Sequence, residues 1–175
     1  MVLTTSCVYQ CPEFPESKLK YVPYKLNDTL SYTNGVDTIE FHVTDYYKTE
    51  KHTIKTGFPV MDIEYEEKAN YTTDINSKVG FYIKEEYDSY WPFKVGFSNY
   101  EVFNFTLVND TRSEENITKK EYNKQQTING ETYYNCFTIE KDKSKFRIWK
   151  IIKADSVGIV EFYDRDYTNP WRKIS

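Results

Sequence analysis

Residues 38–44 read Thr-Ile-Glu-Phe-His-Val-Thr, and this stretch decides the fold class of the chain. Its apolar residues Ile39, Phe41 and Val43 occupy every second position, with polar residues between them. Because successive side chains of a β-strand point to opposite faces of the sheet, the alternation predicts a strand with one buried and one solvated face. Strands of this kind are typical of antiparallel sheets.

Similar stretches follow along the chain and are separated by turn signals. Two Asn-Gly pairs, Asn34-Gly35 and Asn129-Gly130, predict hairpin turns. Helical periodicity is scarce, and only the polar residues 113–122 suggest either a loop or a short helix. The further segments predicted as strands are 30–33, 61–66, 79–84, 102–107, 125–128, 132–140, 146–153, 157–163 and 171–174.

The short connections between these segments favour pairing between sequence neighbours, which gives a meander. We therefore predict an all-β fold, with a single antiparallel meander of about nine or ten strands. A sheet of that width must curl, close or split to manage its twist and its edges. A half-open barrel or a sandwich is expected, and a closed barrel is the alternative.

The composition agrees with one folded domain. The chain has 175 residues, of which 39% are hydrophobic and 29% charged. Its 17 Tyr and 11 Phe residues suit the half-buried surface of a sheet. The net charge is −4 and the basic residues are scattered, so the basic stripe of a nucleic-acid binder is missing. No stretch approaches the ~20 apolar residues of a membrane-spanning helix.

Residues 1–7 read Met-Val-Leu-Thr-Thr-Ser-Cys and resemble a lipobox, the site where bacterial signal peptidase II cuts before a cysteine that receives lipid. Thr5 and Ser6 match the two small positions, whereas Thr4 departs from the usual Leu. We expect lipid on Cys7, a true start upstream of Met1, a tether over residues 1–20 and one β-domain over residues 21–175. An ordinary N-terminus with a chance Ser-Cys is the alternative.

Two further cysteines remain if Cys7 carries lipid. Cys11 and Cys136 would then form an even pair, which could make a disulfide in the oxidising cell envelope. The sequence contains no CxxC pair and no cluster of His and Cys, so we expect no structural zinc site.

Two parts of the chain resemble a known family. Residues 21–32 read Tyr-Val-Pro-Tyr-Lys-Leu-Asn-Asp-Thr-Leu-Ser-Tyr, and the second part combines residues 128–137, 149–151 and 157–162 with Trp171. Together they resemble small secreted lipoproteins of Bacteroidetes-type bacteria, which are rich in β-structure and uncharacterised. Asn27 stands where that family usually has Gly. The resemblance implies a location more than an activity, and it implies no catalytic residues.

No catalytic centre is expected. His42 and His52 are the two histidines, and neither lies beside a nucleophile signature. Residues 164–169 alternate oxygen-bearing side chains but lack the Gly and the Glu of a calcium-binding EF-hand loop. The carboxylates of the middle segments are interpreted as a solvated sheet face; they are Glu64, Glu66, Glu67, Glu85, Glu86 and Asp88. We therefore expect no enzyme activity, no cofactor and no metal.

The best candidate for a binding surface is the aromatic cluster of Tyr87, Tyr90, Trp91 and Phe93. Aromatic faces stack on sugars or fill a pocket on a partner, and Tyr and Trp are enriched at interfaces. The alternative is that these rings pack inside the core, as aromatic residues commonly do.

These observations predict a non-enzymatic lipoprotein of the bacterial cell envelope, anchored to the outer membrane on its periplasmic or surface face. Its β-domain is expected to bind a protein, glycan or lipid, and not nucleic acid. A carrier of an apolar ligand is the alternative, since barrels can enclose such a site. A glycan-acting enzyme comes third, and five Asn-x-Ser/Thr motifs leave a secreted eukaryotic glycoprotein open. A deep cavity lined by Phe and Tyr would favour the carrier, and a filled core would favour a surface binder.

Overall fold

The computed structural model describes residues 7–11, 13–50, 52–56, 67–88, 93–97, 101–105 and 117–174. This part of the chain is all-β apart from one 3-10 helix, η1 (Glu16–Tyr21), so the predicted fold class is confirmed. The strands are β1 (Cys7–Cys11), β2 (Thr29–Thr33), β3 (Thr38–Lys48), β4 (His52–Thr56), β5 (Lys68–Thr73), β6 (Ile83–Asp88), β7 (Phe93–Phe97), β8 (Glu101–Phe105), β9 (Ile117–Ile128), β10 (Glu131–Lys141), β11 (Ile148–Ala154), β12 (Gly158–Asp164) and β13 (Trp171–Lys173).

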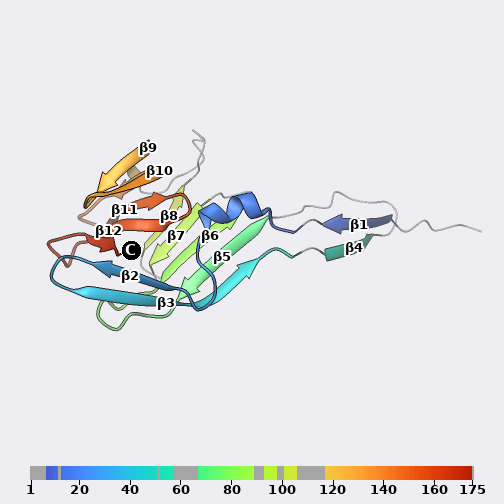
Figure 1. Ribbon diagram of the computed structural model, residues 1–175, viewed down its shortest axis with the longest axis horizontal. Helices are drawn as coiled ribbons and strands as arrows, with labels where there is room; N and C mark the ends of the chain where they lie inside the picture. The colour runs from blue at the N-terminus through green and yellow to red at the C-terminus, as the bar shows by residue number, and fades with distance from the viewer. Residues whose placement is uncertain are drawn as a thin grey trace, which may run out of the picture.

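Eleven of these strands form one antiparallel sheet in the order β8-β7-β6-β5-β3-β2-β13-β12-β11-β10-β9. The sheet curls through 257° into a half-barrel. Figure 1 shows the curled arrangement of its strands. The remaining strands, β1 and β4, pair with each other and project away from the half-barrel.

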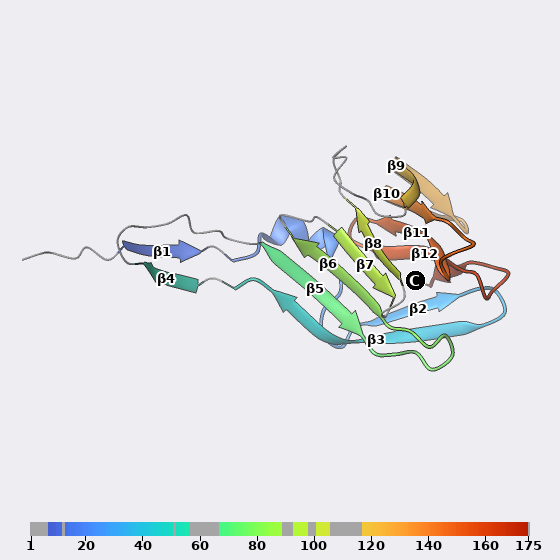
Figure 2. The same ribbon diagram turned by 180° about the vertical axis from the view of Figure 1, so that it is seen from behind.

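The order of the strands follows from the path of the chain. From β2 the chain runs outward through β3, β5, β6 and β7 to the edge strand β8. It then resumes at the opposite edge with β9 and returns through β10, β11 and β12 to β13. β13 pairs with β2, which joins the two halves of the meander. Figure 2 shows the end of the chain, marked C, between β12 and β2.

Both predicted hairpin turns are present. Ile128 pairs with Glu131, so Asn129-Gly130 is a two-residue turn. Both turn residues have positive φ, 50° and 85°, as a type I′ turn requires. The turn at Asn34-Gly35 joins β2 to β3 and is closed by the Asn34 side chain, whose Oδ1 accepts hydrogen bonds from the amides of Val36 and Asp37.

Some predicted elements differ from the structure. The polar segment 113–122 was expected to be a loop or a short helix, but β9 begins at Ile117 and pairs with β10 over its whole length. Pairing with a neighbouring strand has outweighed the weak local helix signal. β5 was not predicted because Ala69, Asn70 and Tyr71 are all buried, and a strand buried on both faces shows no alternation.

Residues 79–84 are only partly a strand. An isolated bridge joins Asn76 to Phe81, and Gly80 between them has a φ of +72°. β6 starts at Ile83, although Val79, Phe81 and Ile83 are all buried as the alternation predicted. The predicted strand at residues 61–66 lies outside the described residues.

The interior of the half-barrel is filled by aromatic side chains. Phe81 packs against Phe41, Phe97 and Phe162 with ring centroids 5.4–6.0 Å apart. The largest fully buried side chains are Trp171, Tyr32, Tyr71, Phe14, Phe41, Phe81, Phe97, Phe103, Phe162, Leu30, Ile83 and Ile139. These residues come from both halves of the sheet, so one core holds the two halves together.

One ion pair crosses this core. Glu85 on β6 bonds through Oε2 to the ammonium of Lys153 on β11, and the two side chains are 1% and 4% exposed. The second oxygen, Oε1, accepts a hydrogen bond of 3.1 Å from the backbone amide of Ile159 on β12. Glu85 therefore does not belong to a solvated face, which corrects the sequence interpretation. Glu86 is also largely covered, and Lys68, Lys84 and Lys94 surround its carboxylate.

Gly158 makes room for this ion pair. A Cβ at this position would lie 2.8 Å from Cε2 of Tyr24 and 3.1 Å from Oε1 of Glu85. Gly158 also has a φ of +77°, a backbone conformation that residues with a side chain rarely adopt. A close approach and a backbone conformation thus both require glycine here.

Removal of Glu85 should take away the carboxylate that the buried ammonium of Lys153 bonds in the core. We expect Glu85→Leu to lower the free energy of unfolding by about 3–5 kcal/mol, and Glu85→Leu/Lys153→Met to regain most of that loss. Urea unfolding of the single and double variants measures both. Equal stability of the two variants would contradict a coupled pair.

Gly158→Ala tests the close approach, with Gly35→Ala as its matched control. Gly35 has a similar φ of +87°, but no atom lies within 4 Å of the place that a Cβ would take there. We expect Gly158→Ala to cost about 1–3 kcal/mol more than Gly35→Ala, because only the former crowds Tyr24 and Glu85. Equal losses in urea unfolding would mean that backbone strain alone accounts for the effect.

Candidate ligand-binding groove

A groove of about 270 Å³ lies beside η1, at the β9 edge of the half-barrel. Its lining comes from η1, β9, β10 and the turn between β11 and β12. The lining residues are Lys20, Tyr21, Tyr122, Asn135, Phe137 and Asp155. The groove thus combines three aromatic rings with an ammonium, an amide and a carboxylate.

The aromatic side of the groove is continuous with the core. Tyr122 and Phe137 are directly opposite each other on β9 and β10, and their ring centroids are 5.1 Å apart. Phe137 is buried, whereas Tyr122 is 52% exposed. Tyr21 is held from behind by Tyr87, with the two rings stacked at 5.4 Å. Tyr122 is therefore the ring that solvent reaches most freely.

A chain of hydrogen bonds connects the polar residues. The hydroxyl of Tyr122 donates to Oδ1 of Asn135 at 2.8 Å, and Nδ2 of Asn135 donates to Oδ2 of Asp155 at 3.2 Å. The ammonium of Lys20 donates to the same Oδ2 at 3.0 Å. This hydrogen bond raises the pKa of Lys20. Burial acts in the opposite direction but is the smaller effect. The charges of Lys20 and Asp155 therefore compensate each other at neutral pH.

Backbone contacts fix η1 beside the turn. The amide of Ser156 donates to the carbonyl oxygen of Lys20 at 2.6 Å. Just beyond η1, the Tyr24 hydroxyl donates to the carbonyl oxygen of Val157 at 2.6 Å and accepts a hydrogen bond from Lys173. These contacts place Lys20 within reach of Asp155.

Asn135 has an unusual backbone conformation for a residue inside a strand. Its φ is +51°, in the left-handed region, which Asn tolerates better than most other side chains. From this conformation its amide reaches both Tyr122 and Asp155. Backbone strain of this kind often marks functional sites.

Tyr87 is the residue of the predicted aromatic cluster whose side chain the structure describes, and it has a different role from the one predicted. Tyr87 is only 7% exposed, with Phe14 against it edge-on at 5.6 Å and Tyr21 stacked on it. It is a packed core residue that supports the groove from behind. Tyr90 and Trp91 lie outside the described residues, and Phe93 begins β7 with its side chain outside the description.

The cysteines lie in two different parts of the fold. Cys136 is a free, buried thiol on β10, and burial together with the charge of Asp155 raises its pKa. Cys7 and Cys11 are the two ends of β1, in the projecting two-stranded sheet (Figure 1). The described structure does not contain the disulfide between Cys11 and Cys136. That disulfide and the lipid on Cys7 stay predictions.

The described residues contain no group of three His, Cys, Asp or Glu side chains that could hold a metal ion. Nδ1 of His42 is 3.0 Å from the hydroxyl of Thr29. Asp164, the first residue of the suspected calcium loop, forms a double hydrogen bond with Arg147. No helix in the described part of the chain is both long and apolar enough to span a membrane.

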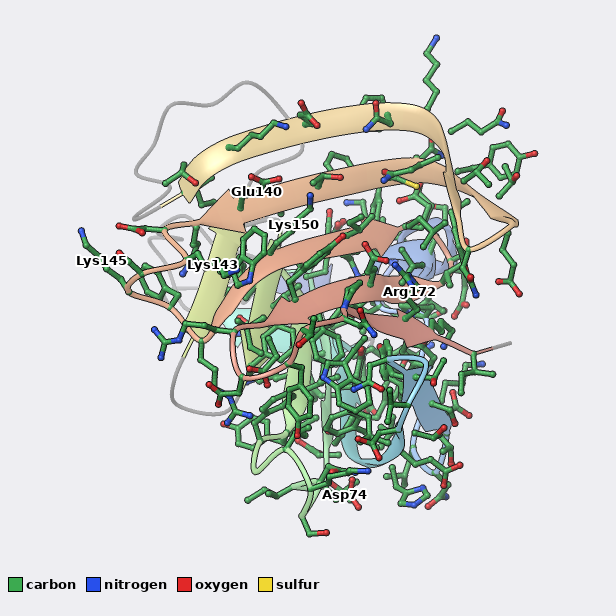
Figure 3. The ribbon with its side chains drawn as sticks, turned by 90° about the vertical axis from the view of Figure 1, so that its left-hand side faces the viewer. Asp74, Glu140, Lys143, Lys145, Lys150 and Arg172 are labelled. Atoms are coloured by element: carbon green, nitrogen blue, oxygen red, sulfur yellow. The ribbon has the colours of Figure 1, made fainter. Side chains whose placement is uncertain are left out.

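The outer face of β10–β13 carries charged side chains that are mostly paired. Figure 3 shows Glu140 and Lys150 side by side on neighbouring strands, where their charged groups are 2.9 Å apart. Arg172 is bonded to Glu161 at 2.7 Å, and Lys143 lies over the ring of Trp149. This face is therefore less suited to binding than the groove, where a half-exposed ring and polar atoms converge.

No family model, no curated protein and no solved structure matches this chain. The interpretation of the groove therefore rests on its own geometry. Sequence reasoning did not identify Lys20, Tyr122, Asn135 or Asp155 as site residues. They are far apart in sequence, and only the return of the meander to η1 brings them together.

Two substitutions of Asn135 separate its side-chain contacts from its backbone strain. Asn135→Gly and Asn135→Ala both remove the bonds to Tyr122 and Asp155, but only glycine adopts positive φ without strain. We expect Asn135→Ala to be about 1 kcal/mol less stable than Asn135→Gly in urea unfolding. In an ordinary strand, Ala is more stable than Gly. If Asn135→Ala is the more stable of the two variants, the left-handed conformation of Asn135 is contradicted.

Proposed function

We propose that this chain is the non-enzymatic β-domain of a lipid-anchored cell-envelope protein, and that it holds its ligand in the groove beside η1. One observation carries the proposal: the described aromatic side chains pack against one another inside the half-barrel, while the groove outside it presents a half-exposed tyrosine beside an ordered polar network. Ligand sites are concave, with aromatic walls and a few placed polar groups, and the groove has this character.

The filled interior argues against a carrier of an apolar ligand. Such carriers enclose their ligand inside the barrel. Here the rings of Phe81, Phe97 and Phe162 occupy that space and contact one another.

The groove also lacks the groups that glycoside hydrolysis requires. That reaction ordinarily uses two carboxyl groups about 5–9.5 Å apart. Asp155 is the single carboxylate that lines the groove in the described part of the chain, and it is paired with Lys20. This supports binding without catalysis.

The position of Cys7 fits a lipid anchor. Cys7 pairs with Thr56 at the outer end of the projecting two-stranded sheet, and Figures 1 and 2 show this sheet pointing away from β9 and β10. Five residues of antiparallel strand span roughly 17 Å. Lipid on Cys7 would therefore hold the half-barrel at a distance from the membrane.

Nuclear magnetic resonance of the full chain tests this proposal. We expect a polar fragment library to contain binders that shift the Tyr122 ring signals, and Tyr122→Ala to abolish their binding. Tyr134→Ala is the matched control, since Tyr134 is 62% exposed on β10 and does not line the groove. Palmitate is expected to leave the core ring signals unchanged; shifts at Phe81 and Phe162 would instead favour the carrier.

A further inference from the structure

We propose that the groove binds one ring of a neutral saccharide, stacked on Tyr122 and hydrogen-bonded to Lys20, Asn135 and Asp155. This inference rests on the proposed function, because it names the ligand class of the same groove. The volume of the groove, the atoms that remain available in it and the balance of its charges all favour this ligand class.

The volume suits a small cyclic ligand. At about 270 Å³ the groove lies just below the ~300 Å³ at which pockets for drug-sized ligands begin. It is also open to solvent on the side of Tyr122. A single ring of a longer chain can therefore occupy the groove while the rest of that chain extends outward.

Donors and acceptors remain available side by side. Both bonds to Asp155 use Oδ2, so Oδ1 has no hydrogen bond to any described residue. The Tyr122 oxygen donates one hydrogen bond and keeps its lone pairs. The Lys20 ammonium has three N–H groups, one of which is bonded to Asp155, and it lies over the Tyr21 ring at 4.7 Å from the centroid. A hydroxyl both donates and accepts, so a ligand with several neighbouring hydroxyls matches this set.

The aromatic ring complements the other side of such a ligand. Among the described residues, Tyr122 has one neighbouring ring, Phe137, tilted by 43°, and Tyr122 itself is half exposed. A pyranose presents a face of C–H groups between its polar edges, and an aromatic face attracts C–H groups with positive partial charge. Stacking on Tyr122 would place the hydroxyl edge toward Asn135 and Asp155.

The charges of the groove disfavour ionic ligands. Lys20 and Asp155 neutralise each other at 3.0 Å, so an anion meets the carboxylate and a cation meets the ammonium. Asp155→Asn removes this balance and leaves Lys20 without its partner. The same groove should then accept anionic sugars.

Chemical-shift titrations of the full chain test the saccharide class. The probes are the methyl glycosides of glucose, galactose, mannose and N-acetylglucosamine, with galacturonate as the anionic probe and adenosine as a flat aromatic probe. We expect at least one neutral glycoside to shift the Tyr122 ring signals in a saturable way. Tyr122→Ala should weaken that binding at least tenfold, and Tyr134→Ala less than twofold.

Asp155→Asn provides the second arm. We expect galacturonate to bind this variant at least fivefold more tightly than the unaltered chain, while the neutral glycoside loses affinity. The inference is overturned if no neutral glycoside shifts Tyr122, or if Tyr134→Ala weakens binding as much as Tyr122→Ala. Shifts by adenosine or galacturonate alone would overturn the neutral saccharide as the ligand class and leave the groove as the binding site. If neither the probes nor the polar fragments shift the Tyr122 signals, both this inference and the proposed function are overturned.

Discussion

The buried ion pair between Glu85 and Lys153 is the constraint on which the other features depend. It links β6 to β11 through the centre of the half-barrel, where an unpaired charge would be strongly unfavourable. The carboxylate also holds the amide of Ile159, and its position requires glycine at 158. Next to that glycine, the Val157 carbonyl anchors Tyr24 and the Ser156 amide anchors η1. The groove is thus positioned from the core outward.

The open meander explains why a binding site lies beside the core and not within it. A chain that begins in the middle of the sheet leaves its two edges at β8 and β9, and η1 packs near the second of these. The aromatic residues that a closed barrel would arrange around a cavity instead meet one another across the half-barrel. What remains accessible is the margin, where Tyr122 extends the aromatic surface toward solvent.

The local patterns of the sequence were sufficient for the fold class but not for the site. Alternation at Ile39, Phe41 and Val43 and the turn at Asn129-Gly130 reflect strand geometry, which acts over a few residues. The sequence interpretation places Glu85 on a solvated face because charge usually means exposure, yet Glu85 shares its face of β6 with Ile83 and Tyr87, which are both buried. Its partner, Lys153, is 68 residues away. No local pattern announces such a pairing, and the same holds for Lys20 and Asp155.

Amide hydrogen exchange at Ile159 tests the central claim most directly. This amide donates to the carboxylate of Glu85, so its protection reports on the ion pair itself. The account predicts that the Ile159 amide exchanges only through global unfolding, with the same free energy as the amide of Ile151 on β11. Exchange of Ile159 as fast as that of an exposed turn amide such as Gly35, while Ile151 stays protected, would contradict it.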